Sequence, residues 1–251
     1  MKSFSLLWKE TFEIIKTRSQ VLFVLSLLSL AVGLILQFFL NPESNATNVI
    51  KINWSNFLPF FVLSFVVNIV IQISSYLTAL DLNSGLIDTL VKAIKNFGSY
   101  IWIALLMFLA IMGGFILLII PGIIFSLWYS FSLVVFLAEN VRGYQALKRS
   151  KELVRGNIGQ IFKRFFFILI FFWIASSVIG YSTAILFENN QMAYMVSNLI
   201  LSSLFMPVFA VFTVVIYRNI AELKGSHGLE LPPQPPMFSE PTDLPPTPPM
   251  N

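Results

Sequence analysis

The chain has 251 residues, of which 57% are hydrophobic and only 11% are charged, and its net charge is +4. A soluble domain carries roughly 25% charged residues because its surface faces water, so this composition argues against a soluble globule and predicts lipid around much of the surface. Cysteine is absent, which excludes disulfides, thiolate metal sites and cysteine nucleophiles. The single histidine, His227, lies in a polar segment, where solvation is its usual state.

The membrane spans are predicted from uncharged runs that are long enough to cross a bilayer. A transmembrane helix needs roughly 20 mostly apolar residues, and each run should be helical because lipid leaves no partner for unpaired peptide groups. The run 96–138 is too long for one span, and Pro121 and Gly122 divide it, because Gly relaxes a turn and Pro suits the first turn of a helix. The six predicted spans are about 20–40, 57–80, 99–120, 121–138, 165–187 and 192–217.

The distribution of basic residues supports this count. With six spans and a cytoplasmic N-terminus, 15 of the 16 Lys and Arg residues lie on the cytoplasmic side. Treating 96–138 as one span would move the basic cluster at 142–164 across the membrane, against the positive-inside rule. The polar segment before the first span contains Glu10 and Glu13. We therefore expect the first span to stay in the protein as a membrane anchor and not to be cleaved as a signal peptide. The expected location is a bacterial-type inner cell membrane with both termini in the cytoplasm.

Similar segments precede the odd-numbered spans, at 6–23, 85–102 and 146–165. Each contains an amphipathic stretch, a basic residue and then a short break with Asn, Ser or Gly before the apolar run. The predicted fold is an all-α integral membrane protein whose six transmembrane helices form three hairpins, each preceded by a cytoplasmic amphipathic helix. Duplication of one unit and shared interfacial physics both account for the similarity.

The third of these segments has the clearest amphipathic pattern. Its apolar face comprises Leu147, Val154, Ile158, Ile161 and Phe165. Its candidate residues for contact with lipid or a partner are Lys148, Arg149, Lys151 and Arg155. We expect the helix to lie on anionic headgroups with its apolar side buried in the membrane, each cation adding about 1 kcal/mol. The alternative is that these charges only set topology on a solvated loop.

The predicted spans contain no Asp, Glu, Lys, Arg or His. Ion-coupled transporters, proton relays and intramembrane hydrolases usually need such a group, because it is costly in lipid and kept for function. The sequence also lacks metal-ligand spacing, paired carboxylates and a phosphate-binding glycine loop. The basic loop has no nucleic-acid-binding fold around it. We therefore expect a protein that is not an enzyme, with no cofactor, no metal and no nucleic-acid partner.

Neutral polar residues remain within the spans. Asn68, Gln72 and Asn198 are candidates for lining a polar cavity, but interhelical hydrogen bonds worth about 0.6 kcal/mol each account for them equally well. A stripe of small residues, which lets helices approach closely, comprises Ser176, Gly180 and Ala184. The stripe could pack within one chain or between two copies of it, so an oligomer is one of the two possibilities.

The segment 225–251 has a different composition. It holds nine of the thirteen prolines, and LPPQPPM at 231–237 nearly repeats as LPPTPPM at 244–250. We expect a disordered cytoplasmic tail with a polyproline-II bias. Such motifs can dock in the aromatic groove of a partner protein, and a solvated tail without a partner is the alternative.

One stretch carries a family resemblance. Residues 118–162 run through PGI, an aromatic span, Glu139, Gly143 and Ala146, and then Ser150, Leu153 and Gly156. The stretch resembles the membrane domain found beside some glycerophosphodiester phosphodiesterases and in related uncharacterised bacterial multi-pass membrane proteins. Because catalysis in that family belongs to a separate soluble barrel domain, the resemblance implies a membrane module and not a phosphodiesterase. The candidate structural residues are Pro121, Gly122, Glu139, Gly143 and Gly156, and Glu139 is expected to pair with Arg142 or with the basic helix.

Two functional hypotheses follow. The first is a non-enzymatic membrane scaffold or sensor that works at the cytoplasmic face through residues 140–164, because charge is concentrated there. The alternative is a permease or exporter for a small neutral or lipid-like solute, lined by Asn68, Gln72 and Asn198. An enzyme acting on lipid headgroups ranks third, because it would need a buried acid or base within the spans.

Overall fold

The computed structural model describes residues 2–40, 54–186 and 191–225. Within these ranges the regular secondary structure is α-helical: α1 (Phe4–Thr17), α2 (Ser19–Leu40), α3 (Trp54–Leu80), α4 (Leu86–Leu117), α5 (Ile119–Tyr129), α6 (Ser132–Glu139), α7 (Tyr144–Val154), α8 (Ile158–Leu186) and α9 (Gln191–Gly225). Six segments are long and apolar enough to cross a membrane, with α5 and α6 together forming the fourth. The prediction of an all-α protein with six candidate spans is confirmed. The predicted Pro-rich tail lies outside the described residues.

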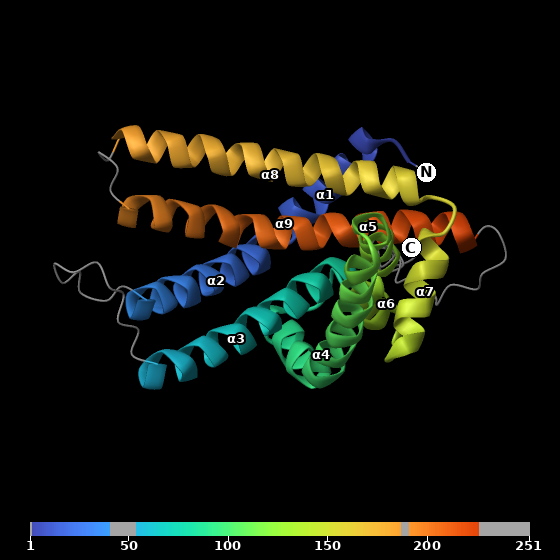
Figure 1. Cartoon of the computed structure of the whole chain (residues 1–251), viewed down its shortest axis with the longest axis horizontal. Helices are drawn as coiled ribbons and strands as arrows, with labels where there is room; N and C mark the ends of the chain where they lie inside the picture. The colour runs from blue at the N-terminus through green and yellow to red at the C-terminus, as the bar shows by residue number, and fades with distance from the viewer. Residues whose placement is uncertain (1, 41–53, 187–190, 226–251) are drawn as a thin grey trace, which may run out of the picture.

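Helices α2, α3, α8 and α9 run along the long axis of the molecule (Figure 1). The core lies toward one end, where buried side chains of α3 (71–79), α6, α7 and α9 (210–221) meet. Elsewhere the apolar faces point outward: only 17% of the candidate span in α8 is buried, against 50% in α9. Lipid suits these outer faces, because water would otherwise contact very large apolar patches.

The helix breaks differ from the prediction in two places. Helix α4 continues from Leu86 to Leu117, so the break predicted near Asn96 is absent. The second predicted hairpin is therefore not preceded by a separate amphipathic helix. The Asn96 side-chain amide donates to the Lys92 carbonyl at 2.9 Å, which satisfies it inside the helix. The next break lies at Leu118, in extended conformation, and not at Pro121. Pro121 is the third residue of α5, where its missing N–H removes no helical hydrogen bond.

Helices α4 and α5 pack closely where Gly114 faces Gly122. A Cβ atom on Gly114 would lie 3.0 Å from the Gly122 Cα and 2.9 Å from the Phe125 ring. Gly180 of α8 likewise faces α9, where a Cβ atom would lie 2.8 Å from the Tyr194 ring. Gly122 therefore has a packing role, and the central glycine of the small-residue stripe is used within the chain, since small residues let helices approach closely.

Replacing Gly114 with alanine is expected to destabilise the protein, because the new methyl group would press on the backbone of Gly122, which cannot rotate away. Gly113→Ala is the matched control: nothing lies within 4 Å of its Cβ position, and removing a glycine from a helix stabilises by about 1 kcal/mol. Thermal unfolding in detergent should show opposite shifts, with a cost of about 1–3 kcal/mol for Gly114→Ala. Equal shifts of the same sign would contradict the close crossing.

Candidate functional site

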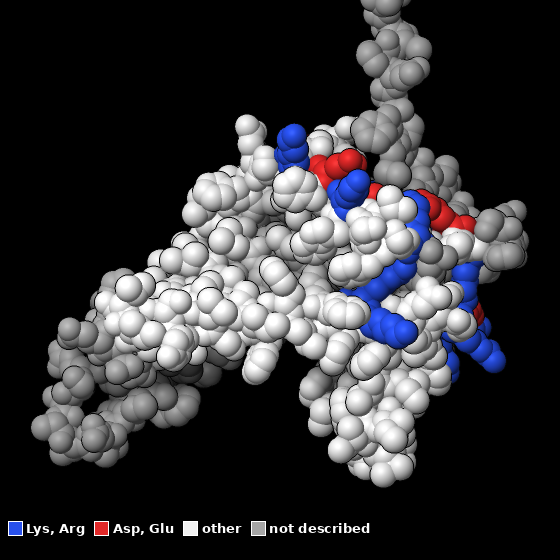
Figure 2. Space-filling view, turned by 90° about the horizontal axis from the view of Figure 1, so that it is seen from above, with Lys and Arg blue, Asp and Glu red and all other residues white. Residues whose placement is uncertain are grey.

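Charged side chains gather at one end of the molecule. Figure 2 shows the blue and red side chains together on one part of this face, while the described surfaces of the two lobes that extend from it are white. Polar contacts at this end join residues distant in sequence, such as Lys2 with Glu222 and Arg218 with Ala79. We call this region, which comprises the α1–α2 junction, the α3–α4 turn, α7 and the last turns of α9, the polar end.

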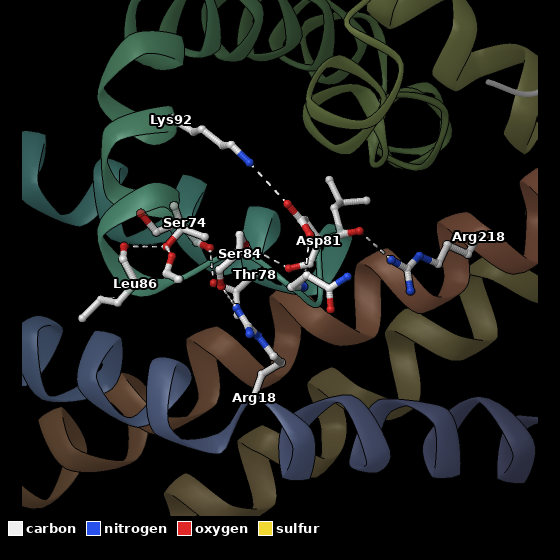
Figure 3. Close-up of polar contacts among 12 residues, drawn as sticks. Arg18, Ser74, Thr78, Asp81, Ser84, Leu86, Lys92 and Arg218 are labelled. Atoms are coloured by element: carbon white, nitrogen blue, oxygen red, sulfur yellow. Dashed lines mark hydrogen bonds and ion pairs between the residues drawn. The ribbon is translucent and has the colours of Figure 1, made fainter. Parts of the chain in front are cut away.

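Two arginines hold the α3–α4 turn, residues 81–85, from other helices (Figure 3). Arg218 of α9 donates from Nη2 to the carbonyls of Ala79 and Leu80, at 2.9 Å each. Arg18, at the α1–α2 junction, donates to the Ser84 carbonyl. The last carbonyls of a helix lack an intrahelical donor and carry partial negative charge. Arg218 therefore caps α3 from outside, with both hydrogen bonding and charge in its favour.

The carboxylate in this turn, Asp81, pairs with Lys92 of α4 at 3.3 Å and accepts the Asn83 amide N–H at 3.1 Å. Burial acts to raise the pKa of Asp81, but the hydrogen bonds from Asn83 and Lys92 outweigh it and hold that pKa below its ordinary value. Its contribution to stability is therefore present at neutral pH and is lost only as the pH falls through the lowered pKa. Because both side chains are largely exposed, this contribution is small.

The first described residues are tied to α8 and α9. Arg164 Nη2 donates to the Lys2 carbonyl at 2.7 Å, and the Lys2 amide donates to Asn219 Oδ1 at 3.3 Å. The Lys2 ammonium group pairs with Glu10 at 2.8 Å and with Glu222 at 3.5 Å. The hydrogen bond to Glu10 raises the pKa of Lys2, against the opposing effect of burial. Helix α1 is thereby fixed on the polar end at its first turn.

Helix α7 packs its apolar face against the protein. Leu147, Leu153 and Val154 are at most 3% exposed, and α7 contacts α4, α5, α6 and α9. The prediction that this face is buried in the membrane is therefore wrong. The physical reason is that the polar end has a core of its own, and these side chains fill it. Ile161, predicted on the same face, is also buried but belongs to α8.

Ser150 joins α7 to the break between α5 and α6. Its hydroxyl donates to the Trp128 carbonyl at 2.7 Å and accepts the Phe131 amide N–H at 3.2 Å. Ser150 and Phe131 are both fully buried, so the Phe131 amide N–H depends on this bond. One side chain of α7 thus satisfies both sides of the bend in the fourth candidate span.

Glu139, at the end of α6, pairs with the basic helix and not with Arg142. Arg149 Nε donates to Glu139 Oε2 at 2.9 Å, and the Tyr217 hydroxyl of α9 donates to Glu139 Oε1, also at 2.9 Å. The Glu139 and Arg149 side chains are 7% and 14% exposed. Because both carboxylate oxygens are bonded, Glu139 links α6, α7 and α9, and Arg149 is used inside the protein.

The other three candidate cations point to a hollow on the outer side of α7. It has a volume of about 270 Å³ and is lined by Tyr129, Tyr144, Lys148, Lys151, Glu152 and Arg155. Positions 148, 151, 152 and 155 share one face of a helix because they are three and four residues apart. Lys151 also lies over the Trp128 ring, 4.1 Å from its centroid. We call this feature the basic hollow. Its cationic side chains suit an anionic ligand, and its tyrosine rings suit an apolar group attached to that ligand.

The remaining structural candidates shape the ends of α7. Gly143 and Gly156 both have positive φ, +60° and +94°, and Asn140 also lies in the left-handed region with φ 53°. Glycine adopts positive φ at little cost. Gly156 separates α7 from α8, where Asn157 accepts the first amide hydrogen bonds of the new helix. These residues therefore set the direction in which the chain enters and leaves α7.

The candidates for a polar cavity make hydrogen bonds mainly within their own helices. Asn68 donates to the Ser64 carbonyl of its own helix at 2.9 Å and accepts from Ser29 of α2 at 3.2 Å. Asn198 donates to the Tyr194 carbonyl of its own helix at 3.0 Å. Gln72, one turn along α3 from Asn68, interacts with the Tyr76 hydroxyl. These bonds favour packing over solute binding, and the permease alternative stays a prediction.

Sequence reasoning did not single out Arg18, Arg164, Arg218 or Tyr217, and it named Ser150 only as part of the family resemblance. The arginines have one sequence signal, since Arg18 directly precedes the first apolar run and Arg218 directly follows the last. A cation at such a boundary also follows from the positive-inside rule, so the signal does not identify a carbonyl partner. Among the described residues no group of His, Cys, Asp or Glu is arranged to hold a metal ion.

Comparison with known proteins returns no match: no family model fits the chain, and neither a curated protein nor a solved structure is significantly similar to it. The resemblance of residues 118–162 to a known membrane domain therefore stays a prediction. The geometry of the polar end is therefore the basis for its function.

Replacing Ser150 with alanine is expected to destabilise the protein by about 1–3 kcal/mol, because it leaves the buried Phe131 amide N–H without a partner and removes the bond to the Trp128 carbonyl. Ser177→Ala is the control, since the exposed Ser177 hydroxyl bonds only the Trp173 carbonyl of its own helix. Urea unfolding followed by Trp fluorescence measures both variants. The bridging role is contradicted if they lose the same stability.

Replacing Glu139 with glutamine is expected to cost about 2–4 kcal/mol, because it leaves the largely buried Arg149 without its counter-charge. Asp81→Asn, which removes an exposed ion pair, should cost under about 1 kcal/mol. In a double-mutant cycle, adding Arg149→Met to Glu139→Gln should recover part of the loss. Additive costs in that cycle would argue against a coupled pair.

Proposed function

We propose that this protein is a non-enzymatic membrane scaffold or sensor that binds the anionic phosphate headgroups of lipids in the basic hollow, at the cytoplasmic face of the cell membrane. The observation that supports it is the placement of Lys148, Lys151 and Arg155 around one hollow with two tyrosines. The inner side of the same helix is fixed in the core, so the cations are presented from a rigid support.

The charge balance of the hollow favours an anion. Within the described residues, neither Lys148 nor Arg155 has a carboxylate oxygen at ion-pair distance, and Glu152 is the one acid that lines the hollow. Each Lys or Arg near an anionic membrane surface contributes about 1 kcal/mol. Tyrosine suits this boundary, because its ring is apolar and its hydroxyl is polar. Three cations and two tyrosines therefore match a phosphate group with lipid chains nearby.

The orientation rests on charge placement. The basic residues of α1 and α7, of the N-terminal parts of α4 and α8 and of the C-terminal part of α9 belong to the polar end or its surroundings, which agrees with a cytoplasmic polar end under the positive-inside rule. The family resemblance points the same way, to a membrane module without its own active site. A headgroup site on that face would let the module recognise anionic lipid and report it to a partner.

The test removes charge from the hollow without touching the core. Lys148→Gln, Lys151→Gln and Arg155→Gln are combined, and Arg149 is left in place because it holds Glu139. Binding of fluorescent phosphatidylglycerol to the purified protein in neutral-lipid nanodiscs should weaken at least about 10-fold, given about 1 kcal/mol per cation. Glycerol phosphate should compete weakly if the headgroup is part of a bilayer lipid, and fully if the true ligand is a soluble phosphate.

The matched control removes three exposed cations elsewhere in the cytoplasmic segments, Lys9→Gln, Lys16→Gln and Lys95→Gln. It lowers net charge equally and leaves the basic hollow intact, so its lipid affinity should stay near that of the parent. An equal loss in both triple variants would show that overall charge, and not the hollow, determines binding. No loss in either would refute the proposed function.

A further inference from the structure

The basic hollow lies beside the point where α9 ends. Lys224, the penultimate residue of α9, donates to the carbonyls of Glu152 and Arg155, the latter at 3.0 Å. Glu152 and Arg155 also line the hollow. The last described residues of α9 therefore lie at the edge of the hollow, at the C-terminal end of α7.

The sequence of the segment that follows Gly225 complements the hollow in charge. Residues 226–251 contain Glu230, Glu240 and Asp243 and no Lys or Arg. Each of the two Pro-rich motifs directly follows an acidic residue, as Glu230 before LPPQPPM and Asp243 before LPPTPPM. The repeated unit is thus an acid, a leucine and two proline pairs. An acid followed by prolines matches a site that offers cations beside tyrosine rings.

The dimensions agree. From Tyr144 to Arg155 the hollow follows eleven residue steps of helix, roughly 16 Å at 1.5 Å per residue. A polyproline-II segment rises about 3.1 Å per residue, so five or six residues of one motif cover that length. The first motif starts six residues after Gly225, a stretch that reaches at most about 20 Å. The first motif is therefore able to lie along the hollow without strain on its linker.

We propose that residues 230–237 dock in the basic hollow, with Glu230 near Arg155 and the proline pairs against Tyr144 and Tyr129. Arg155 lies at the end of the hollow nearest the start of the segment, and Tyr144 lies at the far end. Tyr144 is 70% exposed, so its ring is accessible to prolines. Because the segment is tethered, its effective concentration at the hollow is about millimolar, and weak docking suffices.

Docking of this segment opposes binding of a lipid headgroup at the same cations. The docking itself does not depend on lipid binding, whereas this competition rests on the proposed function. The segment would then act as a tethered competitor, displaced when anionic lipid is abundant or when another protein captures the Pro-rich motifs.

The absence of cysteine allows a direct test by paired substitutions. Gln145→Cys, exposed beside the hollow, is combined with Gln234→Cys between the proline pairs, and a short bis-maleimide is added at low protein concentration in nanodiscs. We expect a high yield of intramolecular cross-link and a several-fold lower yield when Lys95→Cys replaces Gln145→Cys. Equal yields at the two sites, or cross-links mainly between two chains, would overturn the proposal.

Charge exchange separates docking from folding defects. Lys148→Glu, Lys151→Glu and Arg155→Glu should lower the cross-link yield several-fold, and adding Glu230→Lys, Glu240→Lys and Asp243→Lys should restore it. Failure of restoration in a protein with parental thermal stability would refute docking by charge. Raised salt should also lower the parental yield.

A second measurement distinguishes this proposal from the proposed function. Removing residues 226–251 should tighten binding of phosphatidylglycerol several-fold in the assay described above. If the cross-link forms but lipid binds neither protein, docking holds and headgroup binding fails. If lipid binds both proteins equally and no site-selective cross-link forms, the reverse is true.

Discussion

Cationic side chains that donate to main-chain carbonyls hold the polar end together. Arg18, Arg164, Arg218 and Lys224 each reach a carbonyl on a different segment of the chain, and Ser150 does the same without a charge. The carbonyls at helix ends have no partner within their own helix. A cation supplies both a hydrogen bond and favourable charge against the helix dipole. This kind of interaction recurs between α1, α3, α7, α8 and α9, around the apolar core that these helices share.

This arrangement divides the cations of α7 by role. Arg149 turns inward to Glu139 and is nearly as enclosed as its partner, so it contributes to the packing of three helices. Lys148, Lys151 and Arg155 line the outer hollow instead. The two groups alternate along one short helix, whose apolar residues fix its rotation.

Much of the architecture could be predicted from the sequence, because a long run without charge is stable as a helix in lipid and would be insoluble in water. The division of the run 96–138 was also predictable, although its position at Leu118 was not, since a local extended residue leaves no pattern. The environment of the α7 apolar face was predicted wrongly, because Leu147 and Val154 fit a lipid boundary and a protein core equally well. The break expected near Asn96 failed because a polar side chain can bond its own helix.

The polar contacts were the least predictable part of the site. The pairing of Glu139 with the basic helix was open in the sequence, since Arg142 lies only three residues from Glu139 and Arg149 lies ten residues away. The sequence carries no signal for the carbonyl groups that the arginines bind. Every residue has a carbonyl, and tertiary packing determines which one an arginine reaches. The roles of Arg18 and Arg218 thus became visible only when α3 ended beside them.

The attachment of Lys2 sets an order of assembly. Its amide partner, Asn219, follows it by 217 residues, and its carbonyl partner, Arg164, follows it by 162. During synthesis the chain emerges from its N-terminus, so α1 has neither partner while the first four candidate spans enter the bilayer. Helix α1 acquires its final position only after the last helix has been threaded. Closure of the bundle is therefore a late event in biogenesis, and a nascent chain halted before α9 would expose α1 to quality-control proteases.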